Sequence, residues 1–133
     1  MRITGVRVHT VPMANSWLTD SQIAGPLSAY ESYRQQRSSW FGKMSAAVVE
    51  ITTDSGVTGC GTAGGGKGRA AAAIVEDHFT CLLLGRDAFD TELLWQQMYR
   101  ASIMYGRRGL AIEAISAVDI ALWDIRGKAL GQP

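Results

Sequence analysis

The chain has 133 residues, 47% of them hydrophobic, which is enough to build one domain of ordinary size with its own core. Its formal net charge is only +1, so it lacks the overall positive field with which proteins attract nucleic acid or anionic membranes, and we expect neither as a partner. No apolar run approaches the roughly 18 residues of a membrane span, and a strand-like pattern follows directly after Met1, so the default location is the cytoplasm.

Three β-strands are predicted in the first half of the chain. Residues 3–13 alternate apolar and polar side chains, as a half-exposed strand does. Residues 14–44 have no sustained period but carry several large apolar side chains, and loops of this length are usually functional or disordered. Strands over 45–53 and 57–62 flank Asp54-Ser55-Gly56, which predicts a hairpin with glycine in the turn.

Helical periodicity dominates the second half. Helices are predicted over 69–84, where Gly85 can end the helix, and over 90–105, where Asp90 can cap it. The apolar stripe of the first is predicted at Ala71, Ile74, Val75, His78 and Leu82. A third helix from about residue 110 is apolar nearly all round, which indicates burial in a larger body. Strands followed by helices predict an α+β fold, with a three-stranded antiparallel sheet followed by a helical bundle.

Small, apolar and acidic residues recur in a fixed order near the end of the chain. They are Ala114, Ser116-Ala117, Asp119, Ala121-Leu122, Asp124, Gly127-Lys128 and Pro133. In this order the segment resembles the signature of the mandelate racemase and muconate lactonizing enzymes, a branch of the enolase superfamily. The resemblance covers Met1 to Pro133, because three strands followed by helices also form the N-terminal capping domain of that family. It implies a capping domain over 1–109, a connecting helix over 110–133, and a C-terminal modified TIM barrel that is missing, so we expect a fragment of a larger enzyme.

A narrower likeness is carried by Trp17, the run Ile23-Ala24-Gly25-Pro26-Leu27-Ser28-Ala29-Tyr30, Arg37, Thr62-Ala63-Gly64, and Ile74-Val75-Glu76 with His78. These residues look like those of the rhamnonate dehydratase group of acid-sugar dehydratases. The sequence departs from that group at Ser16, where a histidine is expected, and at Gly65-Gly66-Lys67-Gly68. Both departures bear on which sugar acid the protein would accept.

The resemblance implies a carbon–oxygen lyase. In such enzymes a base removes the proton α to a carboxylate, and water is eliminated through an enediolate whose charge Mg²⁺ stabilises. The base and the metal ligands are implied to lie on barrel strands beyond Pro133. We therefore expect no catalytic residue, bound cofactor or metal ligand in this chain, which should be inactive alone, and we expect the parent protein to be a homo-oligomer.

Three residues of the long segment are candidates for binding the acid sugar in the full-length enzyme. The guanidinium of Arg37 presents a fork of donors suited to a polyol, and it matches an arginine of the resembling group. Trp17 would form a rigid wall for the nonpolar end of the sugar acid, and Ser16 is a candidate by position. The alternatives are a solvated arginine and local packing of the loop.

Other residues with reactive side chains have structural explanations. Asp119 and Asp124 are expected to accept hydrogen bonds from backbone or from a basic group of the barrel, because an unpaired buried carboxylate is costly. His9 and His78 have no second ligand four residues on, so neither predicts a metal site. The two cysteines lack the spacing of a zinc or redox pair and are predicted to be buried thiols; they are Cys60 and Cys81.

Three alternatives remain open. Gly61-Thr62-Ala63-Gly64-Gly65-Gly66-Lys67 has the spacing of a phosphate-binding loop, but Gly68 replaces the required Ser or Thr, and the preceding strand belongs to a hairpin instead of a parallel βαβ unit. We expect these glycines to let the chain pass close to the active-site mouth. The chain is alternatively a free-standing, noncatalytic interaction module, or its parent is a racemase or cycloisomerase of the same superfamily.

Overall fold

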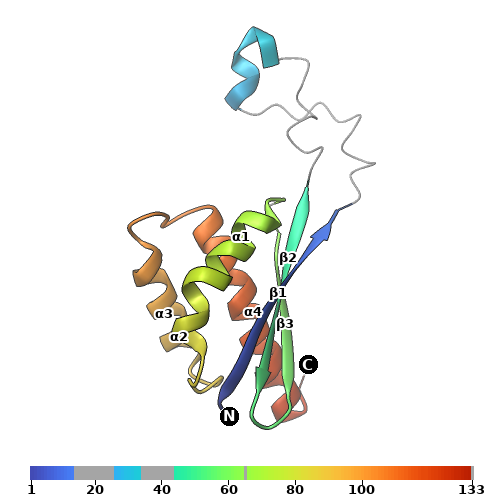
Figure 1. Cartoon of the computed structure of the whole chain (residues 1–133), viewed down its shortest axis with the longest axis vertical. Helices are drawn as coiled ribbons and strands as arrows, with labels where there is room; N and C mark the ends of the chain where they lie inside the picture. The colour runs from blue at the N-terminus through green and yellow to red at the C-terminus, as the bar shows by residue number, and fades with distance from the viewer. Residues whose placement is uncertain (14–25, 34–43, 65, 133) are drawn as a thin grey trace.

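The computed structural model describes residues 1–13, 26–33, 44–64 and 66–132 (Figure 1). It contains a three-stranded antiparallel sheet in the order β1 (Ile3–Pro12), β2 (Ser45–Thr53) and β3 (Thr58–Ala63). Gly56 has a φ of 83° in the turn between β2 and β3, a conformation that favours glycine. The predicted strands and the predicted hairpin are therefore confirmed.

The sheet has one buried and one open face. The central strand β2 alternates strictly, and its side chains at Val49 and Ile51 are fully buried. In the register of the sheet they lie opposite Val8 and Val6 of β1, which pack against the same core. This alternation is the physical reason why the segment forms a strand, because a period of two places all apolar side chains on one side.

The predicted first helix is continuous but contains a wider turn. It comprises α1 (Gly68–Ile74), a π-helical turn η4 (Val75–Phe79) and α2 (Thr80–Leu83). The wider turn inserts an extra residue and rotates all that follows. Phe79 and Leu83 are therefore the fully buried side chains, and the predicted stripe positions His78 and Leu82 are only partly buried.

Two further helices complete the fold, α3 (Thr91–Ser102) and α4 (Leu110–Leu130). The predicted helix over 90–105 ends three residues early, because the backbone N–H groups of Tyr105 and Gly106 both turn back to the carbonyl oxygen of Ser102. In Figure 1 the helices lie on one face of the sheet. None of the helices in the described part of the chain is long and apolar enough to cross a membrane.

Helix α4 packs directly against β3 because both surfaces lack bulk. A Cβ atom at Gly59 would meet the carbonyl oxygen of Ala121, and one at Gly61 would meet that of Ala117. Ala117 and Ala121 are completely buried. The glycines thus allow the helix backbone to approach the strand closely, which explains the small residues at these places in the sequence.

The prediction that both cysteines are buried was wrong, since Cys60 and Cys81 are exposed. On β3 the buried positions are Gly59, Gly61 and Ala63, so the alternation of the strand turns Cys60 to the open face. Cys81 lies on the outer side of α2, next to the buried Leu83. The exposure of Cys60 could not be assigned from the sequence, because the apolar side of β3 consists of glycine and alanine.

Candidate functional site

All three predicted substrate-binding residues, Ser16, Trp17 and Arg37, lie outside the described residues. The structure therefore leaves these assignments as predictions. It does describe two short 3-10 turns within the same predicted loop, η1 (Pro26–Ala29) and η2 (Glu31–Tyr33), which Figure 1 places beyond the end of the sheet where β1 stops.

The structure brings the two ends of this long segment together, and we call this place the loop base. The backbone N–H of Met13 donates to the carbonyl oxygen of Met44 at 3.1 Å, directly after the last strand pair, Pro12 and Ser45. The N–H of Ser45 donates to the carbonyl oxygen of Gly66, also at 3.1 Å. The long segment and the glycine-rich stretch before α1 thus meet at one end of the sheet.

The surroundings of the glycine-rich stretch do not support a nucleotide site. The strand before it, β3, pairs antiparallel with β2, whereas a phosphate-binding loop needs a parallel βαβ unit. Gly68 lies so close to the backbone of Ala46 that a Cβ would collide with it. Gly66 has a φ of 76°, which favours glycine, and a Cβ there would meet the side chain of Met44. These two glycines meet packing and backbone requirements at the loop base.

A second cluster lies where α4 meets the free edge of β3. The Asp124 carboxylate accepts hydrogen bonds from the backbone N–H of Cys60 at 2.9 Å and from Nζ of Lys128 at 2.7 Å. Lys128 also donates to the carbonyl oxygen of Thr58 at 2.9 Å. Since β3 is an edge strand, these two side chains satisfy backbone groups that no neighbouring strand reaches. The expectation that Asp124 accepts a backbone hydrogen bond is confirmed.

The charge state of Asp124 follows from these contacts. The hydrogen bond from Lys128 lowers the pKa of the carboxyl, burial opposes it, and the hydrogen bond from the Cys60 backbone lowers the pKa further. The group is therefore ionised at neutral pH. Its role in the described structure is to stabilise the sheet edge, so proton transfer is not needed to explain it.

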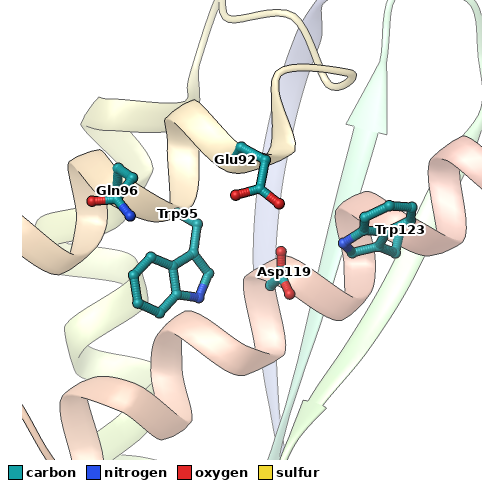
Figure 2. Close-up of a pocket in the computed structure, with 5 residues that line it drawn as sticks. All are labelled: Glu92, Trp95, Gln96, Asp119 and Trp123. Atoms are coloured by element: carbon teal, nitrogen blue, oxygen red, sulfur yellow. The ribbon is translucent and has the colours of Figure 1, made fainter.

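Asp119 has a different environment, in a pocket of about 320 Å³ between α3 and α4. We call this pocket the α3–α4 groove, and its lining is Glu92, Trp95, Gln96, Asp119 and Trp123. Figure 2 shows the carboxylates of Glu92 and Asp119 pointing toward each other between the two indole rings. Burial raises the pKa of Asp119, and the negative charge of Glu92 raises it further. Within the described residues, no basic side chain forms an ion pair with either carboxylate.

The aromatic walls of the groove have partners outside it. The ring of Trp95 stacks on that of Tyr99, with 5.2 Å between the centroids and 15° between the planes. The guanidinium of Arg126 lies 5.0 Å from the centroid of Trp123 and 5.8 Å from that of Phe89. Sequence reasoning did not single out Glu92, because its pairing with Asp119 depends on how two helices pack.

The histidines are not part of a metal centre in the described structure. His78 Nδ1 lies 2.8 Å from the hydroxyl of Tyr105, which links η4 to the turn after α3, and burial raises the pKa of Tyr105. Groups of three or more His, Cys, Asp or Glu side chains that could hold a metal ion are absent among the residues described.

Comparison with known proteins places the chain in a family. Residues 36–133 match the mandelate racemase / muconate lactonizing enzyme N-terminal domain. A putative L-rhamnonate dehydratase from Caldivirga maquilingensis is 44% identical over 84% of the chain and 28% of its own length. The L-rhamnonate dehydratase from Saccharopolyspora erythraea is 35% identical over 100% of the chain and 36% of its own length.

Solved structures agree with these relatives. The crystal structure of L-rhamnonate dehydratase from Gibberella zeae matches 97% of the chain and 32% of that protein, with a TM-score of 0.83 and 42% identity. A structure of rhamnonate dehydratase from the same organism complexed with Mg gives a TM-score of 0.80 and 35% identity, over 97% of the chain and 34% of that protein. The chain thus spans about a third of the length of its relatives. It belongs to the mandelate racemase and muconate lactonizing enzyme family of the enolase superfamily, and it has the fold of the N-terminal domain of that family.

Proposed function

We propose that this domain covers the active site of a Mg²⁺-dependent acid-sugar dehydratase, in a polypeptide where a barrel follows Pro133. The observation that supports it most is the match over nearly the whole chain to L-rhamnonate dehydratases in sequence and in fold. The relatives are about three times as long, which leaves room for a barrel after a domain of this size.

In this proposal Mg²⁺, held by the barrel, would stabilise the negative charge that develops on the substrate carboxylate after loss of the α-proton. The domain itself would exclude water from the reacting atoms and contact the end of the substrate distant from the carboxylate. Arg37 would donate hydrogen bonds to hydroxyl groups of the sugar acid, and Trp17 and Ser16 would line the same space. The loop base supports this role, because it holds both ends of the segment that carries these residues at one end of the sheet.

The experiment starts from the reading frame beyond Pro133. The complete product would be expressed and incubated with Mg²⁺ and a panel of acid sugars that includes L-rhamnonate, and formation of the 2-keto-3-deoxy acid would be measured. We expect turnover with at least one acid sugar and its loss on chelation of Mg²⁺. A reading frame that stops at Pro133, or a complete product that dehydrates none of the panel, would contradict the proposal.

The role of Arg37 is tested in the same assay. Arg37→Ala should lower kcat/KM by roughly 10- to 100-fold, the equivalent of one or two hydrogen bonds to a charged group. Arg34→Ala removes the same charge from the same segment and should leave kcat/KM within about twofold, since it has no proposed substrate contact. Equal kcat/KM values for the two variants would remove Arg37 from the substrate site.

A further inference from the structure

Helix α4 has an apolar face that the described residues leave open. Ala117 and Ala121 are buried against the sheet, whereas Ile120 and Trp123 are 47% and 50% exposed. Large side chains grouped in this way usually mark a surface that another protein covers.

The groove within this surface carries uncompensated negative charge. The carboxylates of Glu92 and Asp119 face each other in Figure 2, and neither has an ion pair among the described residues. The partly buried Asp119 is bordered by two indole rings. A cation at this position would neutralise both carboxylates and lie beside aromatic faces, which attract cations.

Arg126, which contacts one wall of the groove, does not fill this role. Arg126 lies over the ring of Trp123 and that of Phe89, and it makes no ion pair with either carboxylate of the groove. The other carboxylate of α4, Asp124, already has Lys128. Of the two aspartates in the family signature, only Asp119 therefore lacks a basic partner in the described structure.

We propose that the α3–α4 groove receives an arginine side chain from the polypeptide that follows this domain in its longer relatives, an inference that rests on the proposed function. A guanidinium is planar, offers several donors to two carboxylates and stacks on indole rings, so it fits the groove better than an ammonium group does. The indole rings of Trp95 and Trp123, which line the groove, would pack against it.

The position of the groove on α4 supports this source. Trp123 precedes Leu130, the last residue of the helix, by about two turns, or roughly 10 Å. A domain joined to the end of α4 would therefore meet the groove at high effective concentration, without the entropic cost of bringing a separate molecule to it.

The first test uses the 133-residue chain and a small probe. The indole N–H signals of Trp95 and Trp123 would be followed by NMR during titration with N-acetyl-arginine amide, and with the citrulline amide, which has nearly the same shape but no charge. We expect saturable shifts of both indole signals with the arginine probe, and binding at least about tenfold weaker with citrulline, a difference of one charge-assisted contact.

Two double variants make this test specific. Glu92→Gln with Asp119→Asn should abolish the shifts. Glu76→Gln with Asp77→Asn removes the same charge from exposed positions on η4 and should leave the shifts unchanged. Equal binding of citrulline, or shifts that persist in the groove variant, would overturn the inference.

The second test identifies the occupant. Hydroxyl-radical footprinting would measure oxidation of Trp123 in the isolated chain and in the complete product of the reading frame. We expect Trp123 to be protected in the complete product and to become reactive again in the Glu92→Gln, Asp119→Asn variant. A dimer of the isolated chain that dissociates in the same variant would assign the groove to a second copy and contradict our inference.

These measurements are independent of turnover. A complete product that protects Trp123 but dehydrates no acid sugar would overturn the proposed function alone. One that is active while Trp123 remains as reactive as in the isolated chain would overturn the groove assignment alone.

Discussion

Asp124 and Lys128, one turn apart on α4, form an ion pair at 2.7 Å, and each side chain also makes a hydrogen bond to the backbone of β3. One carboxylate oxygen accepts from both the helix lysine and the strand N–H. The pair therefore joins the signature helix to the sheet at an edge where ladder hydrogen bonds are unavailable. Two of the residues that carry the family resemblance thus have a structural explanation.

Asp124→Ala should lower the free energy of unfolding by about 1–2 kcal/mol, because it leaves the Cys60 N–H without its acceptor and Lys128 without its partner. Asp77→Ala, at an exposed site on η4, should change it by less than about 0.5 kcal/mol. Urea unfolding followed by circular dichroism measures both. If the two variants have the same midpoint, the contact with the strand edge contributes nothing measurable.

The two aspartates of the signature should respond to pH with opposite signs. The folded-state pKa of Asp124 is lowered, so its stabilisation is present above the ordinary carboxyl pKa of about 4 and is lost as the pH falls through the folded value. The folded-state pKa of Asp119 is raised by burial and by Glu92, so its charge costs stability at neutral pH. That cost disappears as the pH falls through the raised pKa.

Asp119→Asn should therefore stabilise the isolated chain at neutral pH by up to about 1 kcal/mol, a modest effect because the site is partly solvated. The difference from the parent chain should vanish near pH 4. Unfolding curves between pH 7 and pH 4 test this, and Glu92→Gln should give part of the same gain. A destabilised Asp119→Asn variant at pH 7 would show that the carboxylate already has a favourable partner in the isolated chain.

Gly61→Ala should destabilise the domain by about 3 kcal/mol, because the added Cβ would collide with the backbone of α4 at Ala117. Gly64→Ala is the matched control, since an added Cβ there has no atom within 4 Å, and it should change stability by less than about 0.5 kcal/mol. Thermal unfolding measures the stability of both variants. If Gly61→Ala is no less stable than Gly64→Ala, the close approach of α4 does not require glycine at position 61.

At high concentration the isolated chain should self-associate through the apolar face of α4, so the NMR and footprinting measurements above use the chain at concentrations where light scattering shows a monomer. Ile120→Lys should reduce this association because it removes an exposed apolar side chain and adds a charge. Ser116→Lys, which adds the same charge one turn away on an exposed position, should have a smaller effect. Light scattering at increasing concentration measures the difference. A chain that stays monomeric at every concentration would show that this face does not drive association.

The sequence allowed the sheet to be predicted closely, because strand alternation and a glycine turn are local signals. It did not reveal the π-helical turn at Val75–Phe79, which shifts burial from His78 to Phe79 without any break in helical periodicity. The sequence also contains no local signal for the exposure of Cys60. Its neighbours Gly59 and Gly61 form the buried side of β3, although glycine gives no apolar signal.

In the candidate site, too, the sequence predicted some features and could not predict others. Asp119 and Asp124 look alike in the sequence, five residues apart on one apolar helix. Their environments differ because one faces the edge of β3 and the other faces α3. Glu92 could not be connected with Asp119 from the sequence, since no local pattern records which faces of two helices meet. The substrate-binding assignments of Ser16, Trp17 and Arg37 remain predictions.

The hydrogen bond between Met13 and Met44 has a consequence for how such a domain can diversify. Since the strands on either side already fix both ends, the residues between them can change in length or composition at little cost to the sheet, because closing a longer loop adds only about 0.6 kcal/mol for each doubling. New substrate preferences could therefore arise by exchanging that stretch as a unit, while the packing of β3 on α4 is inherited unchanged.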